Sequence, residues 1–416
     1  MNNDELQILG AEKPKKKDKV MIAILALVAL LAIGGIYYAS SSKQPEKIKT
    51  GKKIGESTIV PELRWAVDSL LNAQMTEIGN CLQGQAIVME VQTGEILAMV
   101  GLERNFEGKF QTCKNFGYQQ ELGSLMKTAS LLTLFEKGID SSYVVHTGEG
   151  IWGVSDSWIV KDHNWRRGGY GDMNLARALE VSSNIGIGMP IWKVYKGHES
   201  DFFDDLNKMS FGQPDFIDGI EGLKPTTYDS PQNSDWVNKF IIWSAIGYNR
   251  KIAPIQMLTF YNAIANDGKM VKPTLKTGEI EIINPQIASK DNIKKMQVIL
   301  EHVVSQGLGR KAGTPILRVA GKTGTSQVNE YDYFNEGGTP LAEYQLAFCG
   351  YFPAEAPKYS IIVSMNKLGL PASGGGMAGV VFSEIVEWMI CHDMPTVLVV
   401  DEEKGDTTKL TEKMIK

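Results

Sequence analysis

An apolar segment near the N-terminus constrains this chain more strongly than any other feature. Residues 20–39 read VMIAILALVALLAIGGIYYA and contain no charged side chain. About 20 apolar residues in a helix are enough to cross the hydrocarbon core of a bilayer. The apolar region of a cleaved signal peptide, the alternative, is shorter, roughly 7–15 residues. We therefore predict one N-terminal transmembrane helix that remains as an anchor, with Tyr37 and Tyr38 at the level of the lipid headgroups.

Lysines flank this segment on both sides and bear on its orientation. Five lysines lie within residues 13–19 and five within residues 43–53. Positive charge favours the cytoplasmic side of a span, and the N-terminal cluster is both tighter and closer to the apolar run. We therefore expect residues 1–19 to be a cytoplasmic tail and the bulk of the chain to be exported.

The chain as a whole has the composition of a globular protein. Of its 416 residues, 43% are hydrophobic and 22% are charged, which excludes a disordered or fibrous chain. The formal net charge of −5 provides no basic field that would favour nucleic acid as a partner. Residues 40–56 are polar and lysine-rich, which is typical of a linker, and residues 396–416 form a charged C-terminal tail. One folded domain over residues 57–395 lies between them.

Strand patterns lie at both ends of this domain and helical patterns fill its middle. Two early strands flank a Gln-Thr-Gly turn, a typical hairpin signal, and three more follow after residue 310. We predict an α/β (α+β) fold: a five-stranded antiparallel sheet whose one face is covered by the first and last helices and whose other face carries a helical subdomain. The predicted strands are residues 85–91, 95–100, 316–328, 344–352 and 359–367, and the two covering helices are residues 61–75 and 377–390.

A Ser-x-x-Lys motif is the first candidate for chemistry, and it occurs at Ser40, Ser124 and Ser364. A lysine can take a proton from a serine three residues earlier only when both lie on one face, as on a helix and not on a strand. Ser364 lies in a strand pattern and Ser40 in the linker. Ser124 opens a helical pattern, so we select Ser124 and Lys127. The alternative role of Ser124 is a helix N-cap.

Two further motifs are equally weak alone. Lys322-Thr323-Gly324, followed by Thr325, lies in a strand pattern, and its hydroxyl and ammonium groups suit an anionic ligand. Gly324 would let an extended peptide approach and pair with the strand. Ser182 and Asn184 lie in a turn between two helical patterns, where Ser and Asn also serve as caps.

Taken in order, these motifs resemble the penicillin-binding transpeptidase and serine β-lactamase superfamily, as a class B-like, minimal member without an N-terminal pedestal domain. The resemblance covers residues 57–392. Tyr248-Asn249-Arg250 stands where the family often has Gln-Gly. Further segments resemble the opening hairpin, the helix after Ser-x-Asn, the last two strands and the closing helix of the family, and these are residues 88–100, 246–273, 348–365 and 374–385.

The resemblance implies a peptidoglycan D,D-transpeptidase that forms cross-links through a serine acyl-enzyme and binds penicillin. Its substrates would be peptidoglycan stem peptides, and β-lactams would be covalent inhibitors. It implies a single-pass protein of the bacterial inner (cytoplasmic) membrane, with its catalytic domain in the periplasm or outside the cell. A separate membrane glycosyltransferase would supply the glycan, and no cofactor is expected. The implied catalytic residues are Ser124, Lys127, Ser182 and Asn184, and the implied substrate-binding residues are Lys322, Thr323, Gly324 and Thr325.

Alternative functions remain open at this point. Water as the acyl acceptor would make the chain a D,D-carboxypeptidase or a β-lactamase. A non-catalytic β-lactam sensor, or a structural subunit of a wall-synthesis complex, would have no reason to keep the lysine and serine groups. The five histidines show no metal-ligand spacing. A Cys81–Cys113 disulfide is a further open alternative.

Overall fold

The computed structural model describes most of the predicted domain. The expected transmembrane helix at residues 20–39 and the C-terminal tail at residues 396–416 lie outside the described residues, and so do the cytoplasmic tail and the start of the linker. Their predicted roles therefore stay predictions. The described residues are 46–155, 158–228, 234–334, 340–392 and 394.

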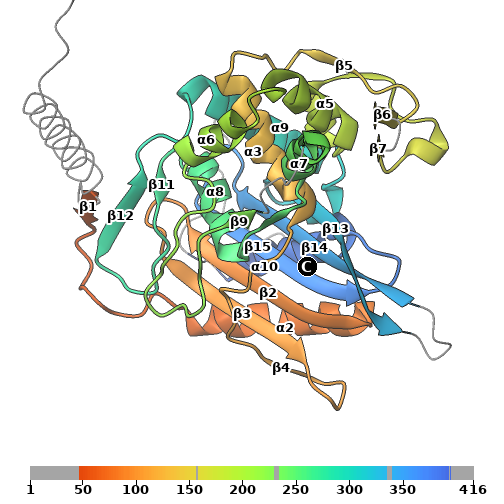
Figure 1. Cartoon of the computed structure of the whole chain (residues 1–416). Helices are drawn as coiled ribbons and strands as arrows, with labels where there is room; N and C mark the ends of the chain where they lie inside the picture. The colour runs from red at the N-terminus through yellow and green to blue at the C-terminus, as the bar shows by residue number, and fades with distance from the viewer. Residues whose placement is uncertain (1–45, 156–157, 229–233, 335–339, 393, 395–416) are drawn as a thin grey trace, which may run out of the picture. The chain divides into compact units, whose positions relative to one another are not determined.

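The central sheet is antiparallel and has the strand order β13-β14-β15-β2-β3-β4 (Figure 1). The five predicted strands are all present, but the predicted number was wrong by one. The sixth strand, β4, has only three residues at the sheet edge, too few to show a strand periodicity. The six strands are β13 (Ala320–Phe334), β14 (Pro340–Phe352), β15 (Tyr359–Leu368), β2 (Cys81–Glu90), β3 (Ile96–Arg104) and β4 (Phe110–Thr112).

Helices α2 (Pro61–Ile78) and α10 (Gly379–Cys391) cover one face of this sheet, as predicted. Val67 of α2 and Phe382 of α10 share a hydrophobic core with Val88 of β2. The neighbouring residue, Ile87, belongs to the core on the opposite face. This alternation is the one expected of a strand that is buried on both faces.

The helical subdomain covers the second face, also as predicted, and Leu131 of α3 and Phe260 of α8 share its core with Ile87. Short hairpins and 3-10 turns decorate it. Its helices are α3 (Met126–Glu136), α4 (Leu175–Glu180), α5 (Asn184–Tyr195), α6 (Ser200–Lys208), α7 (Ser234–Ile246), α8 (Pro254–Ala265) and α9 (Lys290–Ser305). The short strands are β5 (Val144–His146), β6 (Ile151–Ser155), β7 (Trp158–Lys161), β8 (Asp172–Asn174), β9 (Thr227–Tyr228) and β10 (Arg250–Lys251).

Within the described residues, one helix is long and apolar enough to cross a membrane, Gly374–Cys391. It combines the turn η4 (Gly374–Ala378) with α10. Half of this segment is buried inside the protein, and Ile385 packs in the core beneath the sheet. Because the sheet covers its apolar face, we assign it as a core helix of the domain and not as a span.

Residues 47–58, which we call the strap, lie at the start of the described residues and are attached to the domain surface. β1 (Glu46–Lys49) pairs with β12 (Glu279–Asn284), which pairs with β11 (Met270–Val271). Further along, the backbone N–H of Gly55 donates to the carbonyl of Thr277 at 3.0 Å. Residues that we expected to form part of a linker are therefore an ordered element of the domain.

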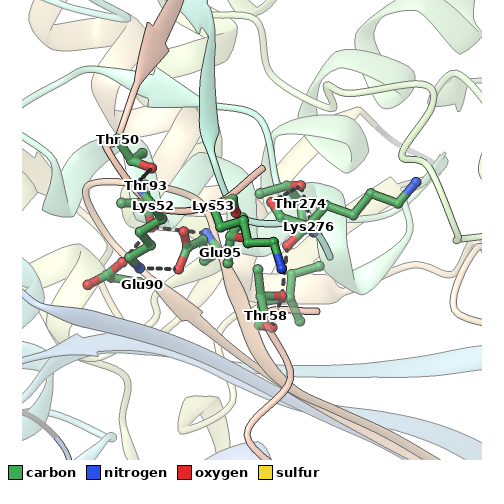
Figure 2. Close-up of polar contacts among 11 residues, drawn as sticks. Thr50, Lys52, Lys53, Thr58, Glu90, Thr93, Glu95, Thr274 and Lys276 are labelled. Atoms are coloured by element: carbon green, nitrogen blue, oxygen red, sulfur yellow. Dashed lines mark hydrogen bonds and ion pairs between the residues drawn. The ribbon is translucent and has the colours of Figure 1, made fainter. Parts of the chain in front are cut away.

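Side chains add to the attachment of the strap (Figure 2). The Nζ atom of Lys52 lies 2.7 Å from Oε2 of Glu95, whose side chain is only 6% exposed. The hydroxyl of Thr58 donates to the backbone oxygen of Ile96 at 2.6 Å. Both partners lie at the start of β3, so the strap is fixed to the first hairpin of the sheet.

Candidate active site

Ser124 lies in the 3-10 turn η1 (Gly123–Leu125), which leads into α3. Gly123 has a φ of +54°, and a Cβ atom at this position would lie 3.0 Å from the backbone carbonyl of Thr325. Glycine is therefore required at residue 123 by the left-handed backbone and by the close approach to β13. As a consequence, the turn that carries Ser124 lies directly against the strand that carries the Lys-Thr-Gly motif.

The capping roles considered for these serines do not apply. Neither η1 nor α3 has a side-chain N-cap hydrogen bond, so Ser124 is not a cap. The turn between α4 and α5 is capped by Ser183, whose Oγ accepts from the backbone N–H of Gly186 at 2.7 Å. Ser182 and Asn184 therefore keep their side chains for other contacts.

Lys127 is fully buried one turn beyond Ser124. Its Nζ donates to the backbone oxygen of Ser182 at 2.7 Å, to Oδ1 of Asn184 at 2.7 Å and to Oγ of Ser182 at 3.3 Å. Burial lowers the pKa of Lys127 to about 7, although the negative charge of Asp162 acts in the opposite direction. A neutral amine, which can accept a proton, is therefore populated near neutral pH.

Ser182 lies between the two buried lysines of the site. Its backbone is left-handed, with a φ of +57°, a strained conformation for a residue with a side chain. Its Oγ accepts from Nζ of Lys322 at 3.0 Å as well as from Lys127. One hydroxyl therefore connects two amines that are distant in the sequence.

Lys322 is also fully buried and donates to the backbone oxygen of Thr323 at 3.0 Å. Burial holds the pKa of Lys322 well below its usual range, and the charge of Lys127 acts in the same direction. The two amines thus compete for protonation and titrate as a coupled pair.

Asp162 holds the turn of Ser182 and Asn184 in place, and sequence reasoning missed it. Its side chain is buried. Its Oδ1 accepts from the backbone N–H of Asn184 at 2.6 Å and of Ile185 at 3.1 Å, and its Oδ2 accepts from Oγ of Ser183 at 2.7 Å. A carboxylate at the start of α5 is favoured by the free N–H groups there. A single aspartate in a polar loop carried no signal of this role.

The remaining motif residues lie along β13, which is an edge strand of the sheet. A Cβ atom on Gly324 would lie 2.6 Å from the backbone oxygen of Leu122. Glycine is therefore needed here for packing of the turn that precedes Ser124, in addition to any role in peptide approach. Thr325 is exposed, and its Oγ1 accepts from the backbone N–H of Gly374 at 3.0 Å.

Among the described residues, the cysteines form no disulfide and no metal-binding cluster is present. All four cysteines are free thiols in the structure. Cys113 pairs with Gly101, which is aligned with Gln85 and not with Cys81. Gln85 and Cys81 are four residues apart along β2, about 13 Å. This distance exceeds the reach of a disulfide. In the described part of the chain, no group of three or more His, Cys, Asp or Glu residues is placed to hold a metal ion.

A cavity of about 430 Å³ lies elsewhere, lined by Arg64 and Asp68 of α2 and by Cys113 and Lys114 near β4. None of the motif residues lines it. The motif residues instead include two buried titratable groups with shifted pKa values, Lys127 and Lys322, which is typical of an active site.

The antiparallel sheet between two helical layers, with a serine–lysine pair beside a Lys-Thr-Gly edge strand, defines the class of penicillin-interacting serine enzymes. The chain belongs to the family of penicillin-binding protein transpeptidase domains, whose family model matches residues 84–387.

Individual relatives are distant but consistent with this family. The chain is 29% identical over 313 residues to "Penicillin-binding protein H" of Bacillus subtilis, covering 67% of this chain and 43% of that protein. It is 24% identical over 349 residues to "Peptidoglycan D,D-transpeptidase FtsI homolog" of Mesostigma viride, covering 75% of this chain and 57% of that protein. The chain thus spans about half the length of the curated relatives it matches.

A solved structure shares the fold. The transpeptidase domain of Burkholderia pseudomallei penicillin-binding protein 3 superposes with a TM-score of 0.66 at 24% identity, covering 82% of this chain and 97% of that one. At this identity the comparison concerns the fold alone.

Proposed function

We propose that this chain is a peptidoglycan D,D-transpeptidase that forms peptide cross-links through a serine acyl-enzyme and is acylated by β-lactams. The observation that carries the proposal is that Lys127 and Lys322 both donate to the hydroxyl of Ser182. Asn184 binds Lys127, and Lys127 lies one turn beyond Ser124. The arrangement combines a serine with a buried amine of lowered pKa, as nucleophilic catalysis requires. Membership of the transpeptidase family also supports the proposal.

In the first step, Oγ of Ser124 attacks the carbonyl between the two terminal D-alanines of a stem peptide. Neutral Lys127 takes the hydroxyl proton, which requires the lowered pKa that burial produces. The carbon–nitrogen bond then breaks, and the departing D-alanine receives a proton through Ser182, whose hydroxyl contacts both lysines. Asn184 orients Lys127 through its Oδ1.

The carboxylate of the terminal D-alanine would bind to Lys322, Thr323 and Thr325 on the edge strand. The backbone N–H groups of Ser124 and Thr325 would stabilise the oxyanion. The close packing of Gly123 on the carbonyl of Thr325 supports this pairing, because it places both backbone segments side by side.

In the second step, the amine of another stem peptide attacks the acyl-enzyme and forms the cross-link. Water as the acceptor would make the chain a D,D-carboxypeptidase or a β-lactamase instead. A long-lived acyl-enzyme with labelled penicillin is expected for the transpeptidase, whereas rapid release of hydrolysed drug would identify a β-lactamase.

We further propose that residues 20–39 anchor the chain in the bacterial inner (cytoplasmic) membrane as a single span, with the domain in the periplasm or outside the cell. The uncharged apolar run of 20 residues supports this proposal. A separate membrane glycosyltransferase would supply the glycan strands.

The decisive experiment is mass spectrometry of the full chain after incubation with a β-lactam. We expect one covalent adduct, on the peptide that contains Ser124, and no adduct in Ser124→Ala. Ser364→Ala is the matched control, since Ser364 also begins a Ser-x-x-Lys sequence but lies on β15. An intact chain without an adduct, or an adduct that persists in Ser124→Ala, would contradict the proposal.

A further inference from the structure

A loop beside the candidate active site carries three exposed cations. We call residues 161–170 the cationic loop; Lys161 ends β7, and Arg166 and Arg167 lie in the turn η2 (Trp165–Arg167). Nζ of Lys161 lies 4.3 Å, and Cζ of Arg166 5.0 Å, from the centre of the Trp165 ring. The aromatic ring thus positions two of the three charges.

The cationic loop is joined directly to the turn that carries Ser182 and Asn184. The backbone oxygen of Lys161 accepts from Nδ2 of Asn184 at 2.8 Å, and the next residue, Asp162, binds the start of α5. Burial lowers the pKa of His163, and the charges of Lys127 and Lys322 act in the same direction. The loop therefore lies close to the two buried lysines.

Hydrogen bonds and close packing hold the backbone of the loop that carries these charges. Nδ2 of Asn164 donates to the backbone oxygen of Gly169 at 2.7 Å. The backbone N–H of Arg167 donates to the backbone oxygen of Asn164 at 2.7 Å. A Cβ atom on Gly169 would lie 2.2 Å from the backbone of Glu149, so the loop packs closely on its neighbour. Preorganised charges cost less to use in binding than mobile ones.

Among the described residues, no acidic side chain forms an ion pair with these three cations. Arg177 and Arg318, by comparison, pair with Glu180 at 2.9 Å and Glu355 at 3.1 Å. Across the residues that the structure describes, Lys161, Arg166 and Arg167 form no ion pair with a carboxylate. The only acid of the loop, Asp162, is buried and is already bound by three donors.

We propose that the cationic loop is a subsite for an acidic acyl donor, and that it binds a carboxylate of the donor peptide upstream of its D-alanyl-D-alanine end. The inference rests on the proposed function and names the substrate class of the same site. The chain has a net charge of −5, which opposes the approach of an anionic peptide. Local cations beside the active site counter this repulsion and select acidic donors over neutral ones.

The test compares two fluorescent peptides that end in D-alanyl-D-alanine and differ only in one upstream glutamate or glutamine. Their dissociation constants are measured by anisotropy on the full chain in detergent, in a Ser124→Ala background that prevents turnover. We expect the glutamate peptide to bind about 3- to 10-fold more tightly at low salt, the scale of two exposed ion pairs. Rising salt should reduce this preference.

Arg166→Gln combined with Arg167→Gln should remove the preference, because it should weaken the binding of the glutamate peptide and leave the binding of the glutamine peptide unchanged. The matched control is Arg104→Gln with Lys114→Gln, near the β4 edge of the sheet, opposite β13. Arg104 is likewise exposed and lies over an aromatic ring. This control should keep the preference.

The subsite would be overturned if the unmodified loop bound both peptides with equal affinity or did not bind the glutamate peptide. It would also be overturned if the double variant lost affinity equally for both peptides, or if the control variant lost as much affinity for the glutamate peptide as the double variant. The proposed function is read separately, from β-lactam acylation of Ser124 in the unmodified chain. Acylation without a peptide preference refutes the subsite alone, whereas a peptide preference without acylation refutes the function alone.

Discussion

The strap region and the active site both contain buried ionisable side chains, but within the described residues only the one in the strap region has a counterion. In the strap region, the nearly buried carboxylate of Glu95 meets the ammonium group of Lys52 at 2.7 Å. In the active site, Lys127 and Lys322 are fully buried and share the hydroxyl of Ser182. Neither of these lysines takes part in an ion pair among the described residues.

The difference shows that a buried ionisable group can stabilise the attachment of a segment in one place and become reactive in another. A buried charge that meets its counterion stays ionised and links two segments. A buried amine without a counterion instead loses affinity for its proton, and this loss turns it into a base. The following predictions, from the largest expected effect to the smallest, test this contrast.

The largest effect is expected for Lys127→Met, which removes the proposed base and keeps an unbranched side chain that is one atom shorter. Acylation by penicillin should slow by about 10²–10⁴-fold, the usual contribution of general base catalysis. The free energy of unfolding should fall by about 1–3 kcal/mol, because the oxygens of Ser182 and Asn184 that accept from Lys127 lose their donor. Stopped-flow acylation and urea unfolding measure the two effects. A variant that acylates normally would disprove the role of Lys127.

The acylation rate should depend on pH through Lys127, whose pKa burial lowers to about 7. Below this value the amine is protonated and cannot accept a proton, so the rate should rise roughly tenfold per pH unit and level off above about pH 7. The unfolded chain binds more protons between about pH 7 and 10.5, so Lys127 should also make the free energy of unfolding rise across that window. A flat acylation profile from pH 5 to 8 would contradict the assignment. Lys127→Met should show a smaller rise in stability, because only Lys322, whose pKa burial also lowers, remains to produce it.

Asp162→Asn should cost about 1–3 kcal/mol of stability, because it weakens three charge-assisted hydrogen bonds at the start of α5. The negative charge of Asp162 raises the pKa of Lys127, so its removal should move the acid limb of the acylation profile to lower pH. Thermal unfolding and the pH profile together separate this charge effect from a loss of structure. A shift of that limb to higher pH would contradict the proposed coupling.

The smallest effect is expected in the strap. Lys52→Gln should lower the free energy of unfolding by about 1 kcal/mol, the scale of a partly exposed ion pair, without changing the rate of acylation. Lys53→Gln is the matched control, because its pair with Glu56 is exposed on both sides and should contribute less. Urea unfolding and penicillin acylation of both variants test the comparison. A strong loss of acylation in Lys52→Gln would show that the strap and the active site are coupled.

Local patterns were sufficient to predict much of this protein. The Gln-Thr-Gly turn predicted the β2–β3 hairpin, and helical spacing after Pro61 predicted α2. The choice of Ser124 over Ser364 followed from helix and strand geometry alone, since one lies before a helix and the other on β15. In each case, residues within a few positions of one another decide the local structure.

Tertiary structure alone decided which distant groups meet. Lys322 contacts Ser182 across 140 positions, Lys52 contacts Glu95 across 43, and Asp162 contacts Ser183 across 21. The sequence indicated Lys322 and Ser182 through motifs, but no pattern indicated the roles of Asp162, the strap or the cationic loop. Spacing along a chain predicts contacts within a helix or a hairpin. The burial that shifts a pKa or pairs a charge arises only when several segments pack together.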